Sequence, residues 1–211
     1  MDLATLRSMV GRDLTQPADG NQRVTAELLT DAINQVYVTL AGMARCFKRT
    51  FTLTSVSGQA SYALPDDVLD VWTARYDGAL LTHTTPWLLS CKNAAWDVAM
   101  TDTPEYEYEP DTTGALGLYP PTDQNGKVIS VTAFVIPYPH ADPAPDGAVL
   151  TLQQDADTPA FPLAYHELLA HAAVLLLASR YLLNDASAAR VQAAQADYER
   201  LLPLFLKQVT A

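Results

Sequence analysis

Cysteine is scarce in this chain of 211 residues: only Cys46 and Cys91 occur, far apart and outside any CxxC motif. A metal knuckle or a disulfide framework needs several cysteines at short spacings, so the sequence argues against both. Two unpaired thiols fit a reducing cytoplasm.

Long apolar runs are also missing. The longest apolar stretch, residues 168–183, is interrupted by His171 and Arg180 and is shorter than the roughly 20 residues needed to cross a bilayer. The first 14 residues are amphipathic and lack the apolar core and cleavage site of a signal peptide. We therefore expect a soluble protein with a buried helix at 168–183 and no membrane contact.

The usual signatures of catalysis are missing too. The sequence has no GxSxG motif, and its nine glycines are scattered singly, so no phosphate-binding loop is predicted. His166 and His171 resemble a zinc motif but are five residues apart, which places them about 140° apart around a helix. We predict no catalytic, cofactor-binding or metal-binding residue.

In the middle of the chain, basic residues are few and acidic residues are many. The net charge is −11; residues 51–160 hold 3 basic and 15 acidic groups, residues 1–50 carry +1, and residues 161–211 are neutral. Nucleic-acid binding requires a basic stripe that releases counterions. The acidic middle segment argues against DNA binding and against adhesion to an anionic membrane.

Helical periodicity marks both ends of the chain. Apolar residues at steps of three and four predict one helix over about residues 3–14 and a second after the N-cap Thr25. A further helix is predicted from Pro162 to about Leu183, and a last one after an N-cap at Asp185. The stripe residues are Leu3, Leu6, Val10 and Leu14 in the first helix, Leu29, Ile33, Val36, Leu40 and Met43 in the second, and Ala189, Ala193 and Ala196 in the last.

Between these ends, from about Phe47, the period changes to two, which predicts strands. Residues 68–76 are expected to form a strand that turns back at Asp77-Gly78, and Asn125-Gly126 predicts a hairpin between 116–119 and 128–136. Residues 137–160 hold five prolines and are predicted to be mostly loop. The fold class is therefore α+β: a helical domain of residues 1–46 and 161–211, with an acidic antiparallel β insertion, a sheet or sandwich, at 47–160.

Two groups in the insertion have alternative interpretations. Glu105, Glu107 and Glu109 share one strand face, about 7 Å apart, and could bind a cation or supply a carboxylate pair; a solvated face opposite two tyrosines is the commoner meaning. Trp72, Trp87 and Trp96 could stack on sugars or bases, although tryptophan in a β-rich stretch is more often core.

Several short motifs occur in a characteristic order. They are Ala32-Ile33-Asn34, Tyr62-Ala63-Leu64-Pro65-Asp66-Asp67, Asp77-Gly78, Trp96, Thr103-Pro104, Leu118-Tyr119-Pro120-Pro121, Asn125-Gly126 and Pro162-Leu163-Ala164-Tyr165-His166-Glu167-Leu168-Leu169. In this order, over nearly the whole chain, the sequence resembles the head–tail adaptor proteins of tailed bacteriophages, also called gatekeeper or head completion proteins.

The resemblance implies a structural virion protein without enzymatic activity or cofactor. Such a protein is made in the cytoplasm of the host bacterium and lies at the head–tail junction of the virion. Such proteins form a homo-oligomeric ring, typically a dodecamer, beneath the portal protein, and join the DNA-filled head to a tail tube or nozzle protein. DNA passes through their channel without specific binding. The alternatives are another neck or tail completion protein, or, from a different class, a carboxylate-based hydrolase or a carbohydrate-binding module.

The C-terminus offers a candidate interface. Pro203 lacks a backbone N–H, which predicts that the last helix kinks or stops there. Beyond it, an apolar stretch at the chain end is typical of a partner surface. The predicted interface residues are Leu201, Leu204, Phe205, Leu206 and Val209. The alternative is that this tail folds back onto its own helices.

Overall fold

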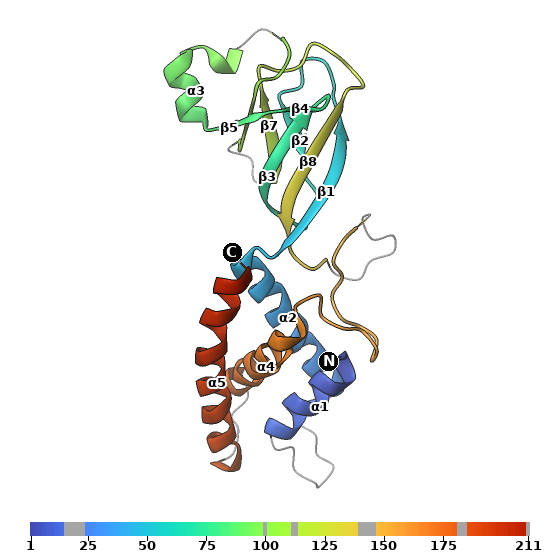
Figure 1. Cartoon of the computed structure of the whole chain (residues 1–211), viewed down its shortest axis with the longest axis vertical. Helices are drawn as coiled ribbons and strands as arrows, with labels where there is room; N and C mark the ends of the chain where they lie inside the picture. The colour runs from blue at the N-terminus through green and yellow to red at the C-terminus, as the bar shows by residue number, and fades with distance from the viewer. Residues whose placement is uncertain (15–23, 99–100, 111–113, 139–146, 181–184, 210–211) are drawn as a thin grey trace. The chain divides into compact units, whose positions relative to one another are not determined.

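The computed structural model describes residues 1–14, 24–98, 101–110, 114–138, 147–180 and 185–209 (Figure 1). The chain divides into two compact units: residues 1–46 with 137–211, and residues 47–136. The first unit holds the helices of both chain ends and the second holds the strands, so the α+β fold class predicted from the sequence is confirmed.

The helical unit is built on amphipathic stripes. Its elements are α1 (Leu3–Asp13), α2 (Ala26–Ala44), the short 3-10 helix η2 (Leu163–Tyr165), α4 (His166–Arg180) and α5 (Asp185–Val209). All four predicted stripe residues at 3–14 are buried. In α4, apolar residues surround the helix and most are buried, because α1, α2 and α5 all pack against it.

The second helix follows its predicted stripe closely. The Thr25 side chain accepts a hydrogen bond from the Leu28 N–H, which confirms the N-cap. The stripe is buried up to Leu40, but Met43 is 53% exposed, so its assignment to the core is wrong. Met43 lies in the last turn, where the chain leaves the helix through Arg45 in a left-handed conformation.

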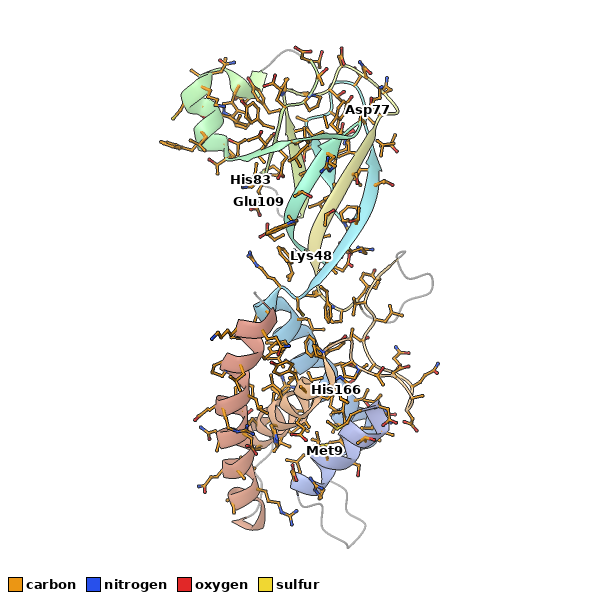
Figure 2. The ribbon with its side chains drawn as sticks, viewed as in Figure 1. Met9, Lys48, Asp77, His83, Glu109 and His166 are labelled. Atoms are coloured by element: carbon orange, nitrogen blue, oxygen red, sulfur yellow. The ribbon has the colours of Figure 1, made fainter. Side chains whose placement is uncertain are left out.

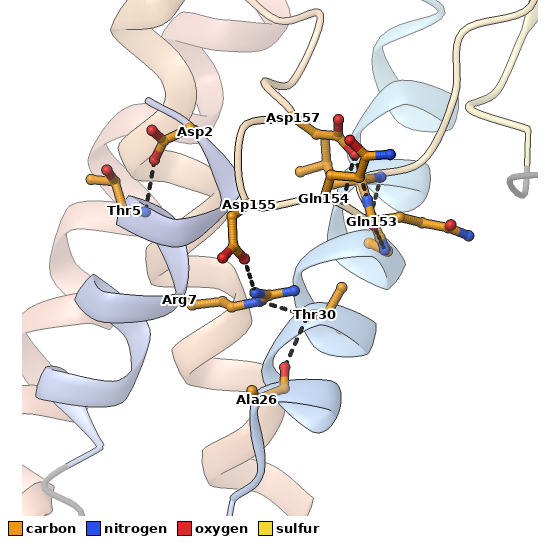
Figure 3. Close-up of polar contacts among 11 residues, drawn as sticks. Asp2, Thr5, Arg7, Ala26, Thr30, Gln153, Gln154, Asp155 and Asp157 are labelled. Carbon is orange, nitrogen blue, oxygen red and sulfur yellow. Dashed lines mark hydrogen bonds and ion pairs between the residues drawn. The ribbon is translucent and has the colours of Figure 1, made fainter.

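The proline-rich segment belongs with the helices. The sequence predicts residues 137–160 as part of the β insertion, whereas in the structure the compact units divide after Ile136. Polar contacts to α1 and α2 explain the difference. Arg7 donates to Asp155 and to Thr30 (Figure 3). The Asn34 amide binds both the N–H and the C=O of Leu152. Its described residues are mostly loop, as predicted, with an isolated bridge between Tyr138 and Leu150.

The β unit is a sandwich of two four-stranded sheets. One has the order β1-β8-β3-β4 and the other β2-β7-β6-β5. The core between them includes Tyr62, Tyr76, Leu116, Leu118, Ile129 and Val131. The strands are β1 (Phe47–Thr54), β2 (Ser61–Ala63), β3 (Val68–Tyr76), β4 (Ala79–Leu80), β5 (Thr82–Thr84), β6 (Tyr106–Tyr108), β7 (Ala115–Tyr119) and β8 (Val128–Val135).

One predicted turn is confirmed and one predicted hairpin is wrong. Asp77 and Gly78 both have positive φ and return β3 into β4. Asn125-Gly126, in contrast, joins strands of different sheets, because β7 pairs with β2 and β6 while β8 pairs with β1 and β3. The turn is held instead by the end of β1: Gly126 N–H donates to the Ser55 carbonyl and Ser57 N–H to the Asn125 side chain.

The second sheet is mixed rather than purely antiparallel. β5 runs parallel to β6, with His83 opposite Glu107, whereas β6 and β2 pair antiparallel with β7. The short helix α3 (Pro86–Lys92) and the 3-10 helix η1 (Trp96–Val98) lie between β5 and β6 in the chain. This connection allows the parallel pairing, which a tight turn cannot make.

Candidate interaction surfaces

The predicted C-terminal interface is divided by the fold. Phe205 is fully buried in the helical unit, with its ring 5.0 Å from Phe161 and 5.1 Å from Tyr165. Leu204 is 53% exposed, and Leu201 and Leu206 are half-buried. Val209 is the last residue of α5, and its side chain lies outside the described part.

The last helix does not stop at Pro203. α5 continues through this residue to Val209. A proline inside a helix costs about 3 kcal/mol, and burial of Phe205 offsets much of that cost, since a fully buried phenylalanine contributes up to about 3 kcal/mol. The Tyr165 hydroxyl also donates to Gln208, which anchors the final turn.

Leu163 adds to the exposed apolar area of the helical unit. It lies in η2 and is 67% exposed. Tyr165, in the same short helix, donates to the Leu204 carbonyl, so η2 and the end of α5 are in contact. Sequence analysis missed Leu163 because it precedes a helix whose apolar residues are mostly buried.

The three glutamates of residues 105–109 do not form a uniformly solvated face. Glu105 and Glu109 are exposed, but Glu107 is 3% exposed and hydrogen-bonds the His83 ring across the β5–β6 pair, at 3.3 Å. Burial raises the pKa of Glu107, although His83 opposes the rise. The solvated interpretation is therefore wrong for Glu107, because the alternation of a strand does not reveal which side faces the core.

A small cavity of about 70 Å³ lies beside this pair. Asp70, His83, Glu107 and Glu109 contribute to its wall, and Figure 2 labels His83 and Glu109 at one edge of the sandwich. Within the described ranges, no three histidine, cysteine or acidic side chains are grouped so as to hold a metal ion. The His83–Glu107 hydrogen bond connects the short strands β5 and β6.

The two helix histidines have separate surroundings. His166 is buried, with Nε2 2.9 Å from the Phe161 carbonyl and Nδ1 2.8 Å from the Met1 amine. His171 faces Asp197 on α5 at 3.9 Å. Each ring lies in its own contact between segments of the helical unit, which gives both a packing role.

The tryptophans are more exposed than predicted. Trp87 on α3 is 71% exposed and Trp72 on β3 is 56% exposed, so the core assignment is wrong for both. Trp96 packs edge-on against Tyr108 and Tyr119. Trp72 lies next to an irregular pairing of β3 with β8, which places its ring outside the sandwich.

Trp72 is part of a cluster that sequence analysis did not find. The Lys48 ammonium lies 4.1 Å from the Trp72 ring centre and 5.0 Å from that of Phe134. These three residues come from β1, β3 and β8, so no local motif connects them. The only signal was the alternation of β1, where Lys48, Thr50, Thr52 and Thr54 occupy one face.

These features define an α+β protein whose described residues expose apolar groups on both units and large aromatic rings on the β unit. The chain belongs to the SU10 adaptor protein family, whose model matches residues 1–211; this is a family of phage head–tail adaptors. No curated protein matches the chain. Every helix in the described part is too short or too polar to span a membrane.

Proposed function

We propose that this protein is the head–tail adaptor subunit that forms a ring beneath the portal protein. The ring joins the DNA-filled head to a tail tube or nozzle protein and leaves a channel for the genome. The protein has no enzymatic activity in this role and resides at the head–tail junction of the virion. Membership of a phage adaptor family over the whole chain is the observation that carries the proposal.

The charge of the β unit supports passage of DNA without binding. Residues 47–136 hold 11 acidic and 5 basic residues. Phosphate binding requires clustered cations that displace counterions. One of the five cations, Arg49, is buried and pairs with Asp67. A ring with this acidic excess repels the DNA backbone and does not retain it.

The end of α5, together with η2, is the proposed contact with the portal or with a neighbouring subunit. Phe205 anchors the helix to its own unit, while Leu204 and Leu163 remain exposed. Exposed apolar groups on a firmly packed element are typical of partner surfaces. Leu201, Leu206 and Val209 flank this contact, whereas Phe205 holds its supporting helix in place.

Complementation tests the proposal. Heads filled with DNA but lacking the adaptor are mixed with purified protein and then with tails. We expect the protein to bind the heads, to prevent loss of DNA and to restore joining to tails. Binding to completed tails but not to heads would instead identify a tail completion protein and contradict the proposal.

The free protein is expected to be monomeric or weakly associated at micromolar concentration. Every copy carries −11, and like charges oppose self-association. Sedimentation at low and high salt measures this. A stable closed ring at low salt without a portal would be inconsistent with assembly that depends on the filled head.

A further inference from the structure

Charge is segregated between the two faces of the β sandwich. The exposed charged residues of strands β1, β3 and β8, Lys48 and Arg75, are both basic, whereas Arg49 is buried and pairs with Asp67. Residues 86–110, which include α3, η1 and β6, carry four exposed acids against one base, Lys92; the acids are Asp97, Asp102, Glu105 and Glu109. The unit as a whole is acidic, so the first of these surfaces is an exception within it.

The first surface is the outer side of the β1-β8-β3-β4 sheet. Lys48, which Figure 2 labels, is exposed there. Trp72 is exposed as well, with Phe134 beside it and a row of threonines along β1. We call this the Lys48–Trp72 face. The Trp72 and Phe134 rings meet edge-on at 5.4 Å, and Lys48 lies over both. In the described part of the chain, Lys48 makes no ion pair, so its charge is held in place on aromatic rings and open to a carboxylate.

The second surface covers the outer side of the other sheet. Trp96 of η1 packs on Tyr108 and Tyr119, and Lys92 of α3 donates to the Tyr106 hydroxyl at 2.8 Å. The segment therefore follows the sheet's outer side and exposes Trp87, Leu88 and Asp97. We call this the α3–η1 surface. Asp102 and Glu105, both exposed, continue its acidic character toward β6.

We propose that the Lys48–Trp72 face of one copy binds the α3–η1 surface of a second copy of this chain. The two surfaces have opposite charge, and each exposes a large tryptophan. Carboxylates such as Asp97 would approach Lys48 and Arg75, while Trp87 and Leu88 would cover Trp72 and Leu69. Buried aromatic anchors surrounded by charge pairs are typical of stable interfaces.

This contact is head-to-tail, because the two surfaces lie on opposite sides of one sandwich. A head-to-tail contact repeats in the same sense from copy to copy and closes into a ring when the rotation permits. The inference therefore rests on the proposed ring and identifies its subunit contact. Two Lys48–Trp72 faces would instead place like charges together, which disfavours a symmetric dimer.

Cross-linking tests the contact with little change to the chain. Cys91 is exposed on α3 and already marks the second surface. Burial raises the pKa of Cys46 to about 11, so that thiol reacts slowly. Thr52 is exposed on β1 and is replaced by cysteine to mark the first surface.

The T52C protein, treated with a bismaleimide at high concentration, is expected to give a ladder of dimers, trimers and larger species. Removing the second thiol (T52C/C91S) should abolish the ladder, yet this variant should still cross-link to the unmodified chain through Cys91. A matched control is T39C, on the exposed side of α2, which should give no ladder. Dimers alone, in every variant, would indicate a symmetric contact and overturn the proposal.

Charge-reversal variants provide a second test of the contact. K48E should lower the cross-linked yield about tenfold or more, and mixing it with D97K should restore the yield. K207E makes the same charge change on α5 and should leave the yield unchanged. Circular dichroism shows whether K48E folds. If it does not, W72A tests the same contact independently and should also lower the cross-linked yield. Equal yields for K48E, W72A and K207E would refute the contact.

The same cross-link on portal-bearing heads separates this inference from the proposed function. Heads that bind the protein without a Thr52-to-Cys91 cross-link would refute the contact and leave the adaptor role standing. A ladder in free solution together with failure to bind heads would refute the adaptor role and leave the contact between copies standing.

Discussion

The two units differ in what they leave on their surfaces. Among the described residues of the helical unit, three large apolar ones are clearly exposed: Met43, Leu163 and Leu204. Among those of the smaller β unit there are seven: Val56, Leu69, Trp72, Leu80, Trp87, Leu88 and Val128. The helical unit thus encloses most of its apolar residues in its own core, whereas the β unit keeps apolar surface available for contacts with other molecules.

The units also differ in what they bury. Among described residues, the buried polar or charged side chains of the β unit are Arg49, Ser55, Asp67, Thr84, Glu107 and Thr122, against His166 in the helical unit. Each short strand buries little apolar area, so polar side-chain contacts such as the Glu107–His83 hydrogen bond help to hold these strands together. Stability therefore comes mainly from apolar packing in the helical unit, and more from specific polar contacts in the β unit.

The largest effect is expected in the helical core. Phe205→Ala removes a fully buried ring that contacts Phe161 and Tyr165, and should lower the free energy of unfolding by about 3–5 kcal/mol. Thermal or urea unfolding measures it, with Leu204→Ala as the exposed control next to it. A change below 1 kcal/mol would show that the end of α5 is not part of this core.

A tight backbone contact is the next test, in the β unit. A Cβ at Gly117 would lie 2.4 Å from the Tyr108 ring, so Gly117→Ala must displace a tyrosine packed against Trp96. We expect a loss of about 1–3 kcal/mol. Gly11→Ala in α1 is the matched control, because the nearest neighbour there is 3.9 Å away, and it should be neutral or slightly stabilising.

The pH dependence of stability provides a third test. The raised pKa of Glu107 means that the folded protein holds this proton more tightly than the unfolded chain does. Glu107 therefore makes the free energy of unfolding fall as the pH rises from the ordinary glutamate pKa through the raised one, with no further change above it. Glu107→Gln should remove this fall.

Urea unfolding across this pH range measures the effect. The exposed neighbour serves as control, since Glu105→Gln should leave the wild-type pH dependence unchanged. If the curves of wild type and Glu107→Gln run parallel throughout, then burial does not raise the pKa of Glu107.

The smallest effect on stability is expected at the proposed partner surface. Leu204→Glu should change the free energy of unfolding by no more than about 0.5 kcal/mol, because the side chain is largely exposed. It should nevertheless weaken binding to heads, which co-sedimentation measures. Unchanged binding would remove Leu204 from the interface, and a large destabilisation would assign it to the core.

Local patterns in the sequence predicted most of the helical unit, but the alanine stripe predicted for the last helix is wrong, because Ala189, Ala193 and Ala196 are exposed. Periodic apolar residues located α1 and α2, and the N-cap at Thr25 marked where α2 begins. These signals come from residues three or four positions apart, so they depend little on the rest of the fold. The helix does not stop at Pro203, because the packing of Phe205 on Phe161, a residue far away in sequence, outweighs the local preference of proline to end a helix.

The β unit was harder to predict because its pairing is not local. Asp77-Gly78 specified its turn by backbone conformation alone, and that prediction is correct. At Asn125-Gly126 only the glycine has positive φ, and the turn is held by Ser55, far away in sequence. The Lys48–Trp72 cluster depends on three strands and on the irregular pairing of β3 with β8, which no sequence pattern revealed.

Electron microscopy of adaptor-free, DNA-filled heads incubated with this protein tests the central claim most directly. Our account predicts added density at the portal vertex only, in the form of a closed ring of copies around the channel axis, with the acidic β units repelling DNA that passes through. Heads without added density, or copies bound anywhere other than the portal vertex, would contradict the assignment of this protein as the head–tail adaptor.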